Sequence, residues 1–288
     1  MSLGTVSELW RYPVKSMAGE RIRECEVNKI FGFPGDRGRA LWDVEAGEIR
    51  GAKRLPRLLE CVARYLDEPS GDGVPGVEIT LPDSQKRNAD DPGVSDALSE
   101  VLGREVRLCV RPPADDLAHY RRAEKITDME HEIRDQCGLL PDEPLPALAD
   151  IDPELFAYVS PPGTYFDGFP LHLITTASLR ELERLLPKSQ IDVRRFRPNL
   201  VVDTDSQFDG FAEFDWCGRE IRIGGMRAKV VMPMMRCAMV TWPQAELPRD
   251  PTIMRSLVRE AGQNLGAGLV VTQPGPVALG DPVEFVSD

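Results

Sequence analysis

The sequence predicts a mainly β (α+β) protein of two packed lobes, built chiefly from antiparallel strands with a few helices. The first hundred or so residues and the last third consist of short runs of high β-propensity, separated by Gly, Pro and Asp. Helical periodicity is concentrated in the middle of the chain, and no P-loop motif occurs. A chain of 288 residues fits one large β unit or two lobes.

The first part of the chain alternates between apolar and charged residues. In the segment RIRECEVNKI the apolar residues recur close to every second position, as the two faces of a strand require. The segments GTVSELWRYPV, GRALWDV and GVEITLP are further strand candidates. One short amphipathic helix is expected at 94–103, where Gly103 can end it.

The middle of the chain has a different composition. Residues 119–139 are rich in charge and in good helix formers, and they predict a helix with one apolar stripe. Residues 141–163 contain many prolines and predict a connector or an ordered irregular loop. After this connector, helices are expected at 176–186 and 251–262, with short strands between and after them.

Charge and composition exclude several classes of protein. The net charge of −12 argues against general binding to nucleic acid or to an anionic membrane. The start of the chain does not have the pattern of a signal peptide, and no run of residues has the length of a membrane helix, so we expect a cytoplasmic protein. The six cysteines are widely scattered and are expected to be free thiols.

One strand-like segment, VVMPMMRCAMV at 230–240, carries a cation beside a thiol. Cys237 could act as a nucleophile or metal ligand when ionised, and a neighbouring cation such as Arg236 favours the thiolate. Adjacent strand residues point to opposite faces, so the pair needs a bend or strand end near Pro233 to share a pocket. On residue chemistry alone, a buried structural cysteine beside a surface arginine is favoured, because free cysteine is among the most buried residue types.

Three loops concentrate positive charge in this acidic chain. They are YPVKS with Lys15 and Ser16, GFPGDRGRA with Arg37, and RRFRPN with Arg197. Each offers backbone amides and cationic side chains, which is the chemistry of a site for phosphate or another anion. Each loop alone is better interpreted as a solvated surface cluster, whereas the three loops together with Arg236 indicate a shared anion pocket.

The three histidines predict no catalytic triad and no zinc site. His119 and His131 lie in or beside the charged helical segment and are expected to be solvated. His172 lies in the strand-like segment FPLHLITT and is expected to be a hydrogen-bonded core residue. Neither GxSxG nor HExxH occurs in the chain.

Taken in order, several segments resemble a known family. LWRYPVKSMAGERIRECEVN, GFPGDRGRALWDV and LPRLL resemble the N-terminal β-barrel domain that precedes MOSC domains. FPLHLITTASLREL, RRFRPNLVVD, FAEFDWCGREIRIGG, MPMMRCAMVT and GPVALGDPVEFV resemble successive motifs of the MOSC domain, which is named for the C-terminal part of molybdenum cofactor sulfurases. The resemblance implies an N-terminal MOSC-type β-barrel domain at 1–112, a helical and proline-rich connector at 113–163 and a MOSC β-barrel at 164–288.

The resemblance also implies a molybdenum cofactor, a molybdopterin that binds molybdenum through its dithiolene. In the amidoxime-reducing members the cysteine of the RC pair binds molybdenum, which gives Cys237 the metal-binding and catalytic role. A thiolate is a soft ligand suited to such a metal. The implied cofactor-binding positions are Lys15, Ser16, Arg37, Asp167, Arg197, the backbone of Met235, and Arg236.

The segment MPMMRCAMVT differs from its relatives at one position. Many relatives carry PCxRC, and Met234 occupies the place of the first cysteine.

The leading hypothesis is a molybdenum-dependent oxidoreductase that reduces N-hydroxylated small molecules with electrons from a separate ferredoxin-, flavodoxin- or cytochrome-type protein. Two alternatives stay open: a sulfur carrier that uses a persulfide on Cys237, and a non-catalytic binder of the cofactor.

Overall fold

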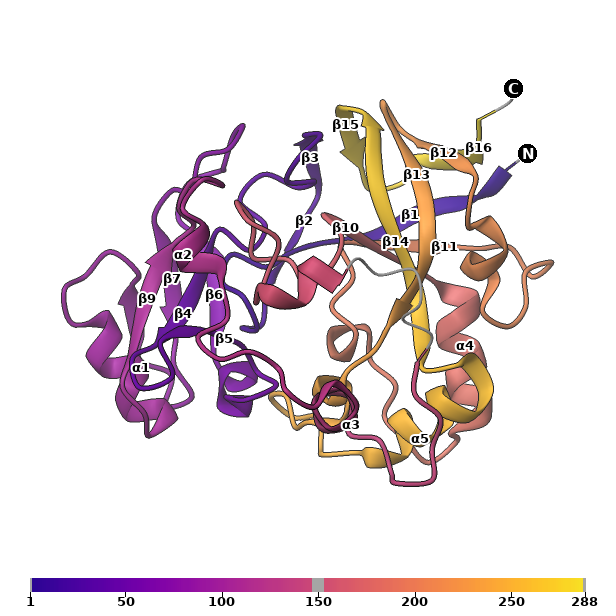
Figure 1. The fold of residues 1–288 in the computed structure, drawn as a ribbon. Coiled ribbons are helices and arrows are strands. Elements are labelled where there is room, and N and C mark those ends of the chain that lie inside the picture. The colour runs from indigo at the N-terminus through magenta and orange to yellow at the C-terminus, as the bar shows by residue number, and fades with distance from the viewer. Residues whose placement is uncertain (1, 147–152, 287–288) are drawn as a thin grey trace.

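A closed barrel of seven strands forms the main body of the protein, in a computed structural model that describes residues 2–146 and 153–286 (Figure 1). In order around the barrel the strands are β11 (Leu200–Asp203), β10 (Leu171–Thr175), β14 (Asn264–Gln273), β13 (Met226–Met235), β12 (Glu220–Ile223), β16 (Pro282–Phe285) and β1 (Ser2–Arg11). β1 also pairs with β11, and this pairing closes the barrel. β10 and β11 run parallel, whereas the other neighbours run antiparallel.

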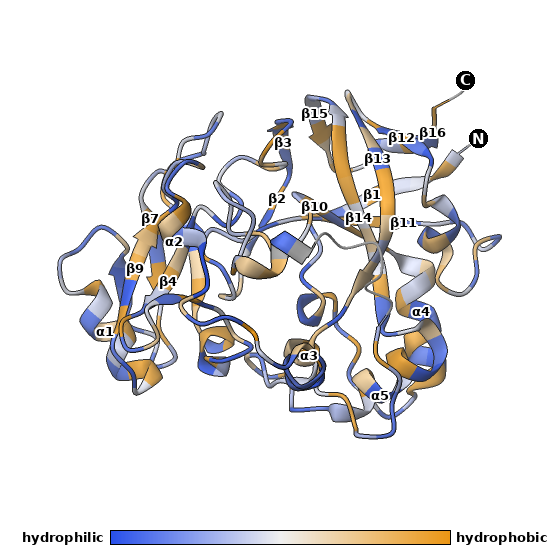
Figure 2. Cartoon of the chain, in the orientation of Figure 1, coloured by the Kyte–Doolittle hydropathy of each residue, from blue (hydrophilic) through white to orange (hydrophobic). Residues whose placement is uncertain are grey.

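The barrel strands point their apolar residues inward. Along β1, Leu3, Val6 and Leu9 are buried, and a register shift between Val6 and Glu8 bends the strand. Apolar residues follow the long strands β13 and β14 (Figure 2). Because β1 comes from the start of the chain and its partners come from the end, the barrel joins residues that are far apart in sequence.

A second lobe contains the residues that follow β1. β2 (Glu20–Ile22) extends the barrel sheet beside β1, and β3 (Glu24–Val27) pairs with β15 (Gly275–Ala278). Two three-stranded sheets then surround a separate apolar core. Their strands are β5 (Glu48–Arg50), β4 (Arg39–Asp43) and β9 (Val106–Val110), and β6 (Val62–Tyr65), β7 (Val77–Thr80) and β8 (Lys86–Asn88).

The helices cover the two lobes and fill the space between them. The α-helices are α1 (Val94–Leu102), α2 (Leu117–Tyr120), α3 (Met129–Cys137), α4 (Thr176–Leu185) and α5 (Pro251–Ala261). The 3-10 helices are η1 (Pro56–Glu60), η2 (Pro153–Ala157), η3 (Val193–Arg195), η4 (Ala212–Trp216) and η5 (Ala238–Thr241). None of the helices in the described ranges is long and apolar enough to cross a membrane.

The predicted fold class, mainly β with a barrel and a few helices, is confirmed. The helix expected at 94–103 ends at Gly103, which adopts a left-handed φ of 64°. The single helix expected over 119–139 is wrong, because the backbone of Arg121 is extended and the carboxylate of Asp128 caps a new helix, α3. The proline-rich segment expected at 141–163 falls partly outside the described residues, at 147–152.

Candidate functional site

The site begins where β13 leaves the barrel. β12 pairs with β13 only as far as Lys229, so β14 alone accompanies the later residues of β13 among the described strands. The pairing with β14 shifts register between Pro233 and Met235. A proline is tolerated in a half-paired, irregular strand end of this kind, and the chain turns inward directly afterwards.

Arg236 and Cys237 directly follow this strand end and have different surroundings. Arg236 is 8% exposed, and its guanidinium donates a hydrogen bond of 2.7 Å to the carbonyl of Phe196. Gln263 fixes the backbone of Arg236, since the amide of Arg236 donates to the Gln263 carbonyl and the Gln263 side chain donates to the Arg236 carbonyl, both at 2.9 Å. Cys237 caps η5, is half-buried and packs against the core of the second lobe. The thiol therefore lies where the two lobes meet.

Two of the predicted cations converge on one aromatic ring. The guanidinium groups of Arg37 and Arg197 lie 5.0 Å and 4.1 Å from the centroid of the Tyr12 ring. Beneath them the fully buried carboxylate of Asp36 accepts hydrogen bonds from the Tyr12 amide, from the Asn199 side chain and from Arg37. Arg197 also donates to the carbonyl of Met17. Loops from opposite ends of the chain thus form one cationic cluster.

Left-handed backbone conformations also gather at this site. The φ values are 68° for Ser16, 51° for Arg37, 54° for Arg197 and 70° for Gln263. A non-glycine residue in this region costs of order 1–3 kcal/mol, and such strain concentrates at binding and catalytic sites. Three of these four residues are positions that the sequence predicts to bind the cofactor.

Lys15 and Asp167 form a second part of the site. The ammonium of Lys15 donates to the carbonyl of Tyr165 at 2.7 Å and to the carboxylate of Asp167 at 2.9 Å. Lys15 is 5% exposed, whereas the Asp167 side chain is 54% exposed, so the pair reaches from the interior to solvent. The hydroxyl of the neighbouring Ser16 accepts a hydrogen bond of 2.9 Å from the amide of Ala52.

The charges of the site are strongly coupled. Burial, helped by the nearby charge of Arg37, lowers the pKa of Arg197 to about 10. Burial also lowers the pKa of Lys15 and of Arg236. Burial would raise the pKa of Asp167, but Lys15, Lys53 and Arg37 together hold it well below its usual range. The site therefore holds more positive than negative charge in a poorly solvated volume and would be stabilised by an anion.

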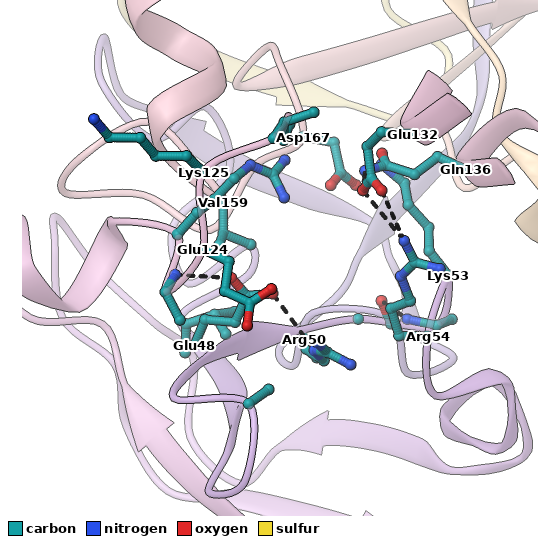
Figure 3. Close-up of a pocket in the computed structure, with 18 of the residues that line it drawn as sticks. Glu48, Arg50, Lys53, Arg54, Glu124, Lys125, Glu132, Gln136, Val159 and Asp167 are labelled. Atoms are coloured by element: carbon teal, nitrogen blue, oxygen red, sulfur yellow. Dashed lines mark hydrogen bonds and ion pairs between the residues drawn. The ribbon is translucent and has the colours of Figure 1, made fainter. Parts of the chain in front are cut away.

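A cavity of 420 Å³ opens beside this charged region. Lys15, Ser16 and Asp167 contribute to its wall, together with residues of the second lobe and of α3. Figure 3 shows Lys53 and Arg54 facing Glu132 and Gln136 across one end of it. Arg54 forms an ion pair of 3.0 Å with Glu132, which ties α3 to the second lobe.

The other predicted residues do not line this cavity. Arg37, Arg197, Met235, Arg236 and Cys237 are absent from its wall. Met235 is 39% exposed at the end of β13. Electrostatic coupling nevertheless connects the two parts. Burial is the largest cause and lowers the pKa of Arg236, whereas the proximity of Cys237 and Asp167 raises it.

Sequence reasoning missed several residues of the site. Lys53 lies in the cavity wall, and although burial lowers its pKa, the nearby Asp167 and Cys237 raise it above the ordinary value. Tyr12 is the first residue of YPVKS and Asp36 is the middle residue of GDR, so their position within the predicted loops was the available signal. Lys53 and Gln263 lie in no motif, and only the tertiary structure brings them to Arg236 and Cys237.

The histidines take part in packing. His172 is 5% exposed and its ring contacts the carbonyl of Leu265 at 3.2 Å, which confirms the expectation of a hydrogen-bonded core residue. His119, which was expected to be solvated, is only partly exposed. Its Nε2 lies 2.7 Å from the hydroxyl of Tyr165, and its ring packs on Trp42, because α2 folds against β5 and its neighbours.

Solved structures with a related arrangement are distant. The YUAD protein from Bacillus subtilis aligns over 99% of this chain and 96% of its own, with 12% identity and a TM-score of 0.44. YiiM from Escherichia coli aligns over 42% of this chain and 55% of its own, with 20% identity and a TM-score of 0.33.

Curated proteins give a clearer relationship. The chain is 26% identical to mitochondrial amidoxime-reducing component 1 from Homo sapiens, over 98% of this chain and 82% of the relative. It is 28% identical to mitochondrial amidoxime reducing component 2 from Rattus norvegicus, over 83% of this chain and 67% of the relative. Molybdenum cofactor sulfurase from Drosophila willistoni is 31% identical, over 35% of this chain and 12% of the relative.

Family models account for most of the sequence. The model of the MOSC N-terminal beta barrel domain matches residues 3–100, and the model of the MOSC domain matches residues 162–284. The second match contains β10 to β15 and nearly all of β16, and the first contains nearly all of β1. The chain therefore belongs to the MOSC domain proteins and carries a MOSC N-terminal β-barrel domain ahead of its MOSC domain.

Proposed function

We propose that this protein is a molybdenum-cofactor-binding oxidoreductase that reduces N-hydroxylated compounds with electrons from a separate protein. The observation that carries the proposal is the gathering of Arg37, Arg197 and Arg236 in one charge-coupled region with the Cys237 thiol. The relationship to two amidoxime-reducing components supports the class of substrate.

The residues present fit an anionic cofactor. One terminal nitrogen of Arg197 and the Nε of Arg236 are buried and have no hydrogen-bond partner in the described part of the chain. Buried donors in native proteins are nearly always satisfied, and guanidinium groups bind phosphate oxygens especially well. Unsatisfied donors in a cationic, strained site are accounted for if a phosphate-bearing group such as a pterin phosphate occupies it.

Cys237 fits the role of the metal ligand. Its thiol is half-buried, and it is coupled to the charges of Lys53 and Arg236. A thiolate is a soft ligand suited to molybdenum. Arg37, Arg197 and Arg236 would hold the anionic part of the cofactor, Lys15 and Ser16 would contribute from the second lobe, and the backbone of Met235 would lie beside the metal ligand.

Bound molybdenum cofactor would supply the two-electron redox chemistry. In the overall reaction an N-hydroxylated compound takes up two electrons and two protons, its N–O bond breaks, and water leaves. The cavity of 420 Å³ has the size of a small-molecule site and is the proposed entrance for substrate. Lys53 and Asp167 would orient the polar group of the substrate from its wall.

Electrons must come from a partner protein in this proposal. We propose a ferredoxin-, flavodoxin- or cytochrome-type donor. The proposed donor is therefore identified by reconstitution with candidate proteins of each type.

The experiment measures cofactor content, thiol reactivity and turnover together. The protein is produced in a host that makes molybdenum cofactor, and molybdenum, pterin and iodoacetamide labelling of Cys237 are quantified. We expect molybdenum and pterin in near-equal amounts, a protected Cys237, and reduction of an aromatic amidoxime by a chemical electron donor. Molybdenum and pterin near zero, with Cys237 alkylated freely, would overturn the proposal. Retained cofactor without turnover would instead favour a non-catalytic cofactor binder.

A specific observation also favours a second candidate function, sulfur transfer. Cys237 is an accessible thiol close to cationic groups, and part of the chain is similar to a molybdenum cofactor sulfurase. In this role Cys237 would carry a persulfide donated by a cysteine desulfurase. Mass spectrometry after incubation with such an enzyme tests it, and the absence of added sulfur on Cys237 would exclude it.

We further propose the division of the chain into an N-terminal part at 1–112, a connector at 113–163 and a MOSC part at 164–288. The separate apolar core of the second lobe supports an N-terminal unit. Since β1 pairs with β11 and β16, the proposed first part also completes the barrel of the last part.

A further inference from the structure

A second thiol lies next to the segment that carries Cys237. Cys137 is the last residue of α3 and is 3% exposed. The following residue, Gly138, contacts Ala238, the residue that follows Cys237. A Cβ placed on Gly138 would lie 3.2 Å from the Cβ of Ala238 and 3.9 Å from its Cα. The two cysteines thus directly precede a point of close backbone approach.

Gln263 connects the two thiol-bearing segments. Its side chain donates to the carbonyl of Arg236 at 2.9 Å. The same side chain lies near the Cys137 thiol, where it lowers the pKa of that thiol against the larger, raising effect of burial. Gln263 is 2% exposed, so this connection is shielded from solvent.

Electrostatic interactions also place Cys137 close to Cys237. The pKa of Cys137 is raised chiefly by burial and further by the proximity of Cys237. The pKa of Lys53 responds to both thiols. No other pair of cysteines in the described residues shares such a coupling with a single cation. Arg255 donates to the Gly138 carbonyl and holds the end of α3 in place.

We propose that Cys137 and Cys237 form a reversible disulfide when a hydroperoxide oxidises the protein. The half-buried Cys237 thiolate attacks the hydroperoxide, gains one oxygen as a sulfenic acid, and releases an alcohol or water. The Cys137 thiol then attacks the Cys237 sulfur, the S–S bond forms, and water leaves with the oxygen and two protons. The hydroperoxide is the two-electron oxidant, and an external dithiol restores both thiols.

The disulfide would protect the site and close it. It would prevent oxidation of Cys237 to the irreversible sulfinic acid. It would also occupy the sulfur that the proposed function assigns to molybdenum, so loading of cofactor and formation of the disulfide would exclude one another. The disulfide itself does not depend on the proposed function, because it forms in cofactor-free protein.

Peptide mapping of the full chain tests this proposal. Cofactor-free protein from a host that lacks molybdopterin is treated with hydrogen peroxide, alkylated without reductant, digested and analysed by mass spectrometry. We expect a pair of peptides joined through Cys137 and Cys237, with a mass two hydrogens below the sum of the separate peptides. Treatment with a dithiol should separate the two peptides again. In Cys137→Ala and Cys137→Ser we expect Cys237 to gain two oxygens instead.

The controls make each outcome decisive. Cys109→Ala removes a half-exposed thiol on β9 and should leave the joined peptide unchanged. Circular dichroism establishes that the Cys137 variants fold, and the mapping of the unmodified chain stands without them. If Cys237 in the unmodified chain reaches the sulfinic acid as fast as in the variants, with no joined peptide, the proposal is overturned. That result would leave the molybdenum proposal untouched, since cofactor content is measured separately.

Discussion

Arg37 and Arg197 place their guanidinium groups against the same ring, 5.0 Å and 4.1 Å from the centroid of Tyr12. Two like charges this close are held by the buried Asp36, by the π face of Tyr12 and by the hydrogen bond from Arg197 to the carbonyl of Met17. Burial, with the nearby charge of Arg37 as a second cause, lowers the pKa of Arg197 to about 10 and so disfavours its charged form. The site is thus organised before an anion arrives.

Replacing Arg197 should therefore separate binding from folding. In Arg197→Gln one hydrogen bond and a ring contact are lost, but like-charge repulsion is relieved, so the free energy of unfolding should change by no more than about 1 kcal/mol. Molybdenum and pterin retained after purification should fall at least about tenfold, the equivalent of roughly 1.4 kcal/mol of binding. Metal analysis and chemical unfolding measure the two effects.

A nearby arginine provides the matched control. Arg194 lies in the same RRFR segment but forms surface ion pairs with Asp192 and Glu246. Arg194→Gln should leave cofactor content unchanged. Equal loss of cofactor in the two variants would show that general charge, rather than the cluster on Tyr12, retains the cofactor.

The left-handed backbone at Ser16 predicts an unusual order of stabilities. Ser16→Ala loses the hydrogen bond from Ala52 and keeps the strained φ of 68°, whereas Ser16→Gly loses the same bond and relieves the strain. We expect the glycine variant to be more stable than the alanine variant by about 1 kcal/mol. Urea unfolding of both variants measures this, and an alanine variant as stable as the glycine variant would contradict it.

The pair formed by Lys15 and Asp167 predicts a change in titration. Asp167 raises the pKa of Lys15 against the larger, lowering effect of burial, so Asp167→Asn should lower the pKa of Lys15 further. Because the folded-state pKa of this lysine lies below its unfolded value of 10.5, the unfolded state binds more protons and stability rises with pH through this range. In the variant that rise should begin at a lower pH.

Nuclear magnetic resonance of the labelled lysine side chain measures this titration. The cost in stability should stay near 1 kcal/mol or below, since the Asp167 side chain is more than half exposed and Lys15 keeps its bond to the Tyr165 carbonyl. An unchanged pKa of Lys15 would mean that Asp167 does not govern the charge of this residue.

Glu213, which lies outside the candidate site, predicts that the stability of the protein depends on pH. It is fully buried, and burial raises its pKa even though Ser178, Thr175 and the amide of Gly266 donate hydrogen bonds to it. A carboxyl group with a raised folded-state pKa binds more protons when folded, so stability falls as pH rises from the unfolded value of 4.5 through the folded value. Glu213→Gln should remove this slope.

The comparison needs only unfolding curves at several pH values above 4.5. Glu183→Gln on the exposed face of α4 serves as the control and should keep the slope of the unmodified protein. A slope that persists in Glu213→Gln would assign the pH dependence to another group.

Local structure was predictable where the signal is local. The period of two marks strands, and Gly103 marks the end of α1, because a left-handed C-cap favours glycine. The closure of the barrel by β1 and β11 carries no such signal, since it depends on pairing between the two ends of the chain. The break between α2 and α3 depends on a contact of Arg121 with the segment around Tyr158, which residue patterns do not encode.

The site was predictable only where a motif marks it. Lys15, Arg37, Arg197 and Arg236 lie in recognisable segments, although the left-handed φ of Arg37 and Arg197 is not evident from residues that seldom adopt it. Cys137, Lys53 and Gln263 lie outside every motif. The proximity of Cys137 and Gln263 to Cys237 follows from the packing of α3 and α5 against η5.

The most direct measurement is the molybdenum and pterin content of the unmodified protein and of Cys237→Ser, both produced in a host that makes the cofactor. If Cys237 is the metal ligand and the arginines hold the pterin, the unmodified protein should contain both in near-equal amounts. Because the pterin dithiolene holds the metal, the variant should retain several-fold less molybdenum and pterin together. Equal molybdenum in the two proteins, or none in the unmodified protein, would contradict the assignment of Cys237 and of the site around it.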